Sequence, residues 1–240
     1  MTRRGLLWLP AIAWAQQPDG LQYSLTKYVN DNGKVQYGAL KADLGPLTKY
    51  VEDLNTFDLN RLKSREEKLA HWINVYNALI LWSFATDYPQ EKDRLKNPLR
   101  RAAYFYRRKF LVSGQERSLD DIESNSLRKA FAEPRIHFAI VCASASCPYL
   151  SRKTYTRVDV IERLELDAKR FLESERNVKV NATAKTVTVS EIFKWFRADF
   201  GGSEQTVLQF LSRYVKKAKL SEPGWKIQYA SYDWTINDAS

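Results

Sequence analysis

The chain has 240 residues, of which 44% are hydrophobic and 13% aromatic, and its formal net charge is +10 at pH 7. This length and composition predict a chain that can bury a sizeable core, and the aromatic content argues against intrinsic disorder. No apolar run reaches the roughly 18 residues that a membrane-spanning helix needs, so we expect no transmembrane segment in the mature chain.

Residues 1–15 have the three parts of a secretion signal. Two arginines precede an apolar stretch, and the A-x-A sequence at 13–15 provides a cleavage site. A short buried helix is the alternative, but Pro10 would fit poorly inside it. We therefore expect a cleaved segment 1–15, a single domain over 16–240, and a secreted or periplasmic location. For an exported basic protein, nucleic acid is a disfavoured partner, and an anionic envelope polymer, lipid or peptide is the expected one.

The first half of the chain predicts mainly helices. A tight Asn-Gly turn at 32–33 is expected after a helix, and a helix is expected over 39–55, with a break allowed at Gly45-Pro46. Ser64 and Glu67 form a capping box for a helix that runs to about residue 86. Because that helix is apolar nearly all round, it should be central and buried.

The second half mixes short strands with helices. Residues 136–143 are apolar and rich in β-formers, which predicts a strand in the middle of a sheet. The remaining expected elements are a hairpin that turns at 113–114, a helix over 118–130, a helix over 156–174, a hairpin over 177–190, helices over 190–200 and 203–217, and a last strand near 225–234. This mixture, without a regular strand-helix-strand order, predicts an α+β domain with a small mixed or antiparallel sheet and hairpins packed against several helices.

Four parts of the sequence together resemble one family. They are "EKLAHWINVYNALIL", "SLDDIESNSLR", "PRIHFAIVCASASCPYL", and "SEIFKWFRADF" with "LSRYVKKAK…YASYDWTIN". Over roughly residues 20–238, and in this order, the chain is similar to a bacterial member of the domain of unknown function 547 (DUF547) family. The resemblance implies a distant relation to papain-like or transglutaminase-like thiol enzymes.

The resemblance also implies which polar residues matter. It places the recurrent polar positions of the family on Asn74, Tyr76, Asn77, Glu123 and Cys142. The Cys-Pro pair at 147–148 matches the bacterial form.

Two positions depart from the family pattern. Many relatives have histidine at the position of Ser124, and most have phenylalanine at the position of His71. If the family's activity uses a histidine at the position of Ser124, this chain lacks it, and His137 is the remaining family-like histidine.

The two cysteines leave three alternatives open. In a regular strand, His137 and Cys142 would point to opposite faces and lie roughly 16 Å apart at about 3.3 Å per residue, so they would not form a dyad. Cys147 precedes a proline that suits the first turn of a helix, where the pKa of a thiol is lowered. The cysteines either form a Cys142–Cys147 disulfide, provide a free catalytic thiol, or remain two unpaired structural residues.

Other polar residues have both a functional and a structural interpretation. His71, Asn74 and Asn77 lie three residues apart, so they share one helix face and either line a cleft or hold loop backbone, with Tyr76 in the core. Glu123 either orients a histidine or pairs with Arg135. No metal-ligand spacing, phosphate-binding loop or dinucleotide motif is present, so we expect no cofactor or metal.

Residues 94–109 combine seven Lys or Arg residues with three aromatic residues and no acid. The stretch is either an anion-binding patch or a solvated loop before a hairpin. The arginines that would carry the first interpretation are Arg100, Arg101, Arg107 and Arg108.

These features support two hypotheses about function. The first is a thiol-dependent hydrolase or acyl-transferase on a peptide or amide-like envelope substrate, in a cleft between the 64–86 helix and the 136–143 strand. Its roles are Cys142 or Cys147 as nucleophile, His137 as base, Glu123 as the orienting acid, and Asn74 or Asn77 as oxyanion donors. The second is a non-catalytic module with a structural disulfide that binds an anionic glycan, lipid or protein partner.

Overall fold

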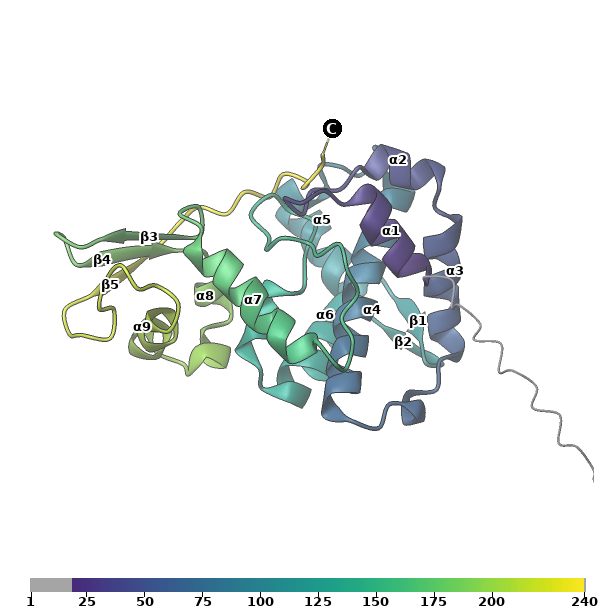
Figure 1. Cartoon of the computed structure of the whole chain (residues 1–240). Coiled ribbons are helices and arrows are strands. Elements are labelled where there is room, and N and C mark those ends of the chain that lie inside the picture. Colours follow the sequence, from purple (N-terminus) through teal and green to yellow (C-terminus); the bar gives the residue numbers. More distant parts are fainter. Residues whose placement is uncertain (1–18, 240) are drawn as a thin grey trace, which may run out of the picture.

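Helix α4 (Arg65–Asp87) runs through the larger part of the molecule (Figure 1). The structure is a computed structural model and describes residues 19–239. The Ser64 hydroxyl accepts from the backbone N–H of Glu67, and the Glu67 carboxylate accepts from the N–H of Ser64, which confirms the predicted capping box. Nearly every residue from Leu69 to Ala85 is buried, as expected for a central helix.

The elements before and after α4 in the first half of the chain pack around it (Figure 1). The break between two helices falls beside Gly45, as predicted. Gly20 is needed where the first helix meets the third, because a Cβ there would lie 1.7 Å from the carbonyl oxygen of Pro46. The elements are α1 (Gly20–Tyr28), α2 (Tyr37–Ala42), α3 (Gly45–Asp53), η1 (Leu54–Thr56), η2 (Leu59–Arg61), η3 (Arg94–Lys96), α5 (Pro98–Ala102), η4 (Ala103–Arg107), β1 (Phe110–Val112), β2 (Gln115–Arg117), α6 (Leu119–Asp121) and η5 (Ile122–Lys129).

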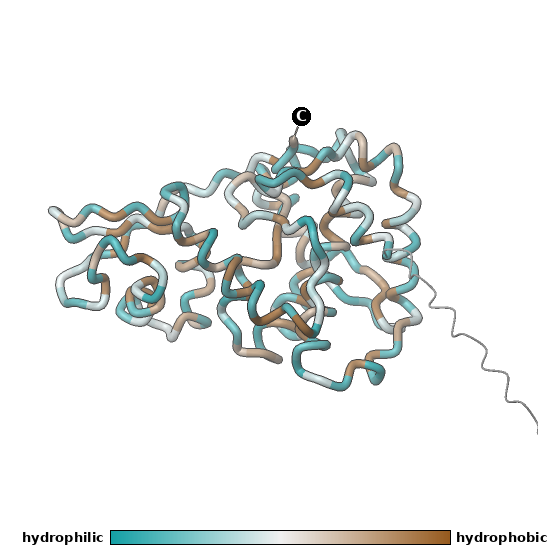
Figure 2. The backbone as a smooth tube through the Cα atoms, viewed as in Figure 1, coloured by the Kyte–Doolittle hydropathy of each residue, from teal (hydrophilic) through white to brown (hydrophobic). Residues whose placement is uncertain are grey.

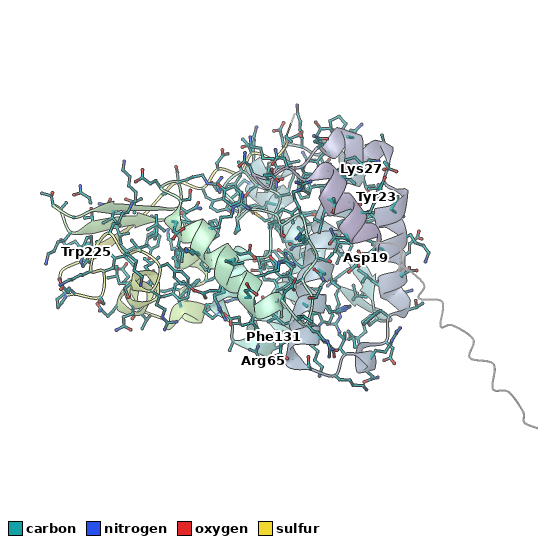
Figure 3. The ribbon with its side chains drawn as sticks, viewed as in Figure 1. Asp19, Tyr23, Lys27, Arg65, Phe131 and Trp225 are labelled. Atoms are coloured by element: carbon teal, nitrogen blue, oxygen red, sulfur yellow. The ribbon has the colours of Figure 1, made fainter. Side chains whose placement is uncertain are left out.

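Hydrogen bonds and ion pairs of side chains connect the ends of several of these elements. Arg65, at the start of α4, donates to the carbonyl oxygen of Phe131 at 2.6 Å and lies over that ring (Figure 3). On α1, Tyr23 and Lys27 both donate to Asp43 at 2.8 Å, which ties α1 to the end of α2.

The second half forms a smaller part with its own core. Strands β3 and β4 make the predicted antiparallel hairpin, and β5 joins β4 in parallel, so the sheet is mixed. The hydrophobic residues of both parts gather toward the inside (Figure 2). The elements are η6 (Pro134–Phe138), α7 (Val160–Glu173), β3 (Val178–Asn181), β4 (Thr186–Val189), α8 (Ile192–Trp195), η7 (Arg197–Phe200), α9 (Glu204–Ser212) and β5 (Lys226–Tyr229). The predicted α+β class is confirmed, and no helix within residues 19–239 is long and apolar enough to cross a membrane.

The strand predicted over 136–143 does not form. Residues 134–138 make the short helix η6, and residues 139–143, which are buried apart from the partly exposed Cys142, do not pair in a sheet. The side chain of Asn77 provides hydrogen bonds to part of their backbone instead. The Asn77 amide donates to the carbonyl oxygen of Ala139 at 2.9 Å and accepts from the N–H of Val141 at 3.1 Å. Asn74 makes the same pair of bonds with the backbone of Tyr155, at 2.8 and 2.9 Å.

After β5 the chain returns to the larger part (Figure 1). The N–H of Ala145 donates to the carbonyl oxygen of Thr235 at 2.7 Å, and the N–H of Asn237 donates to that of Ala143 at 2.9 Å. Asn237 also accepts from the Tyr37 hydroxyl at 2.8 Å. The segment 230–239 therefore holds the loop that carries the cysteines.

Replacing Asn77 tests its two bonds to the backbone. Asn77→Ala leaves a buried N–H and a buried C=O without their partner, so we expect the free energy of unfolding to fall by about 2–4 kcal/mol. Urea denaturation measures this change, and Asn60→Ala, at an exposed position of η2, serves as the control. A loss of less than about 0.5 kcal/mol, the usual range for a surface substitution, would contradict the assigned role.

Candidate active site

A pocket of about 620 Å³ opens between the two parts of the molecule. Its walls come from α4, from α5 and η4, from η5, from the 137–148 segment, and from α8 with the C-terminal segment. The predicted cleft beside α4 thus exists, but it has more walls than the two that were expected. The pocket brings together these residues from the sequence-based set: Tyr76, Arg101, Glu123, His137, Cys142 and Cys147.

The two cysteines lie side by side at the pocket and are both free thiols. The predicted disulfide is therefore not present in this structure. Ala143 has a φ of 65°, and the turn that follows brings Cys147 Sγ to 2.9 Å from the N–H of Cys142. The Ser144 and Tyr232 hydroxyls lie 3.4 and 3.5 Å from the same sulfur, each oriented to donate.

These contacts give the two thiols different pKa values. Burial alone would raise the pKa of Cys147, but hydrogen bonds from the Cys142 thiol, Ser144, Tyr232 and the Cys142 N–H lower it to about 6. Burial raises the pKa of Cys142 well above its ordinary value, and the bond to Cys147 raises it further. Near pH 7, Cys147 is therefore the thiolate and Cys142 the thiol.

A carboxyl group provides the acid of the same pocket. Burial raises the pKa of Glu123, an effect that His137 and Tyr76 partly offset. The Tyr76 hydroxyl donates to Glu123 Oε2 at 3.1 Å. Burial keeps the pKa of Tyr76 well above its ordinary value, with added contributions from Glu123 and Cys142, so this phenol stays neutral.

His137 does not face the cysteines. Its Nε2 lies 2.6 Å from Asp199 Oδ2, and its ring stacks on Phe196 with a centroid separation of 4.1 Å. Arg128 donates to both oxygens of Asp199, at 2.6 and 3.2 Å. Although burial opposes it, these hydrogen bonds hold the pKa of Asp199 well below its usual range. Within residues 19–239 no hydrogen bond joins His137 to either thiol.

Several predicted site residues have structural roles outside the pocket. Asn74 and Asn77 use their amides on loop backbone, so neither can serve as an oxyanion donor. His71 stacks on Phe57 with a centroid separation of 4.5 Å. Arg135 pairs with Glu133 and Glu165, not with Glu123.

Most basic residues of the stretch 94–109 pair with acids that precede or follow it. Arg100 pairs with Glu91, and Arg108 pairs with Asp87 at 2.6 Å. Arg107 is exposed and does not line the pocket, whereas Arg101 does. Of the four arginines considered for an anion-binding patch, Arg101 is the one that lines the pocket.

Other site residues were missed by the sequence analysis. Asp199 and Tyr232 lie in two of the stretches that carried the family resemblance, "FRADF" and "YASYDW", which was the signal available for them. Ser144 and Arg128 also lie in such stretches, "PRIHFAIVCASASCPYL" and "SLDDIESNSLR", but a serine between two cysteines and an arginine on a helix are ordinary residues. No group of three His, Cys, Asp or Glu residues suited to a metal ion occurs in the described part of the chain.

Comparison with known families places the chain. Residues 59–172 match the family model described as "Protein of unknown function, DUF547", which confirms the predicted resemblance over this part of the chain. Comparisons with curated proteins and with solved structures give no match. The matched residues include α4, both cysteines, Glu123 and His137.

His71 provides a test of stability against pH. Burial lowers its pKa to about 4, whereas an exposed histidine in the unfolded chain titrates near 6.5. The unfolded chain therefore takes up the proton first, and stability that is present above pH 6.5 is lost as the pH falls toward 4. Between pH 7 and pH 4, His71→Phe should lose about 2–3 kcal/mol less unfolding free energy than the wild type.

Urea denaturation at both pH values measures this difference. Phenylalanine keeps the ring contact with Phe57, so the two proteins should be similar in stability at pH 8. Equal losses in variant and wild type would show that His71 is not held neutral by the fold.

Proposed function

We propose that the pocket is the active site of an exported thiol-dependent hydrolase or acyl-transferase that acts on a peptide or amide-like envelope substrate. The observation that carries this proposal is the set of donors around Cys147 Sγ: the N–H of Cys142 and the hydroxyls of Ser144 and Tyr232. A thiolate is the nucleophilic form of cysteine, and hydrogen bonds to the charged form favour it. The export component rests on the secretion signal predicted over 1–15, which lies outside the described residues.

The nucleophile is Cys147. Its thiolate attacks the acyl carbon, the carbon–nitrogen bond breaks, and a thioester forms on Sγ. Transfer of the acyl group to water gives hydrolysis, and transfer to an amine gives acyl transfer. In either case the thiolate is released at the end of the cycle.

The proton donor is Glu123. A buried carboxyl group with a raised pKa carries a proton at higher pH than an exposed one, which suits a general acid. It donates its proton to the leaving nitrogen and takes one back from the attacking water. We assign this role to Glu123 and not to His137, because Asp199 engages the Nε2 of that buried ring.

A second candidate is the binding module with bridged cysteines. The observation in its favour is the contact between Cys142 and Cys147, because two adjacent thiols can be oxidised to a disulfide. In that state the protein would bind an anionic glycan, lipid or protein partner without covalent chemistry. The state of the thiols in the native protein separates the two candidates.

Alkylation across a pH range tests the thiolate. Mass spectrometry of each cysteine peptide should give a rate midpoint near pH 6 for Cys147 with iodoacetamide, and much slower reaction at Cys142. Tyr232→Phe should raise the Cys147 midpoint by about one unit, because a hydrogen bond to a charged group contributes roughly 1.5 kcal/mol or more. Tyr106→Phe, at an exposed position beside the pocket, is the matched control.

Two results would count against the thiol mechanism. One is a Cys147 midpoint at or above about 8.5, the value of an ordinary cysteine. The other is a native protein that shows no free thiol and stays unreactive under mild reductant, which would support the binding module.

Leaving-group dependence tests Glu123. A p-nitrophenyl ester releases a stable anion and needs no proton donor, whereas a peptide amide does. We expect Glu123→Gln to lower kcat on an acyl peptide amide by about 10²–10⁴-fold and to leave turnover of p-nitrophenyl acetate within a few fold. Cys147→Ser should abolish both. Equal loss on ester and amide would assign Glu123 a role other than proton donation.

A further inference from the structure

Arg101 differs from its basic neighbours in what it pairs with. Arg94 and Arg100 are bound by Asp87 and Glu91, and Arg108 is bound by Asp87. Within residues 19–239, Arg101 has no carboxylate partner. Its one hydrogen bond is from Nη1 to the carbonyl oxygen of Leu95 at 2.7 Å. Arg101 is also the arginine of this stretch that lines the pocket.

An aromatic surface holds the guanidinium of Arg101 in place. The guanidinium carbon lies 3.8 Å from the ring centroid of Trp234. Trp234 contacts Tyr232 at a centroid separation of 4.5 Å and stacks with Trp195 at 5.5 Å and 28°. Trp195 is 42% exposed although it lines the pocket. One end of the pocket is thus a fixed cation beside an exposed aromatic platform.

The charges of the other walls leave Arg101 as the anion-binding group. The remaining pocket arginine, Arg128, is held by both oxygens of Asp199. The acids Asp120 and Glu123 belong to a different wall, formed by α6 and η5, and each already bonds a neighbouring hydroxyl. A single unpaired guanidinium matches the single charge and the planar geometry of a carboxylate.

We propose that Arg101 determines specificity by binding a carboxylate of the substrate, while an adjacent apolar side chain of the substrate lies on Trp195 and Trp234. The substrate class is then an acyl peptide or acyl amino acid that bears a free carboxylate next to an aromatic or aliphatic group. This inference rests on the proposed function of the same pocket, and it specifies what that function acts on.

Binding of two matched probes tests the inference. N-acetyl-phenylalanine carries the carboxylate, and N-acetyl-phenylalaninamide replaces it with a neutral amide of nearly the same shape. By isothermal titration calorimetry, we expect the acid to bind the wild-type protein about tenfold more tightly than the amide. Arg101→Gln should abolish this preference, Arg101→Lys should keep part of it because the charge remains, and Arg100→Gln should leave it unchanged.

The comparison of acid with amide on the wild type needs no variant, so it stands even if Arg101→Gln does not fold. Equal affinity for the two probes, or binding of neither at millimolar concentration, would overturn the inference. So would a preference that persists in folded Arg101→Gln.

The same measurement separates this inference from the thiol mechanism. If the wild-type protein turns over no acyl substrate but keeps the carboxylate preference, the thiol mechanism is removed and the specificity stands. Turnover that depends on Cys147 but is indifferent to the carboxylate would do the reverse.

Discussion

The side-chain amide of Asn77 makes hydrogen bonds to the backbone of residues 139–141, a buried segment that is not paired in a sheet. Burying an N–H and a C=O without partners would cost several kcal/mol, and Asn77 satisfies one of each within residues 139–141. Because α4 is fixed by its burial, the amide also fixes where this segment lies. The positions of His137 before it and of the cysteines after it depend on this attachment, and segment 230–239 holds the cysteine loop from the other side.

Asn74 and Asn77 show why polar residues on a buried helix need not be catalytic. They lie on one face of α4, and each makes a donor–acceptor pair with a backbone that passes across that face. The structural interpretation offered from the sequence was therefore the correct one for both amides. Tyr76, which lies between them in sequence, is the residue of this turn that reaches the pocket.

Local sequence patterns predicted the regular elements well and the central segment poorly. The capping box of α4 and the turns of both hairpins depend on neighbours within a few residues, so the sequence around them is sufficient. The segment 136–143 has the composition of a buried strand, but its hydrogen-bond partner is a side chain sixty residues or more away. A hydrophobic composition indicates that a segment is buried, but it does not indicate which groups will satisfy the hydrogen bonds of its backbone.

The error over the strand also changed the expected chemistry. The estimated separation of His137 from Cys142 assumed an extended chain. In the structure His137 lies in the short helix η6, and Cys142 is followed by a turn at Ala143, so the chain between them is not a regular strand. The turn brings the two cysteines together, and His137 forms a hydrogen bond with Asp199, which lies far along the chain. The composition of residues 94–109 likewise did not show the ion pairs of Arg100 and Arg108, because their acidic partners lie outside that stretch.

The return of the chain after β5 has a consequence for the order of assembly. The family match ends at residue 172, yet the donor Tyr232 and the platform residue Trp234 lie far beyond it. During synthesis both cysteines and their local donors emerge before Tyr232, which lies 85 residues after Cys147. The hydrogen bond from the Tyr232 hydroxyl to Cys147 Sγ therefore cannot form until that part of the chain has been made.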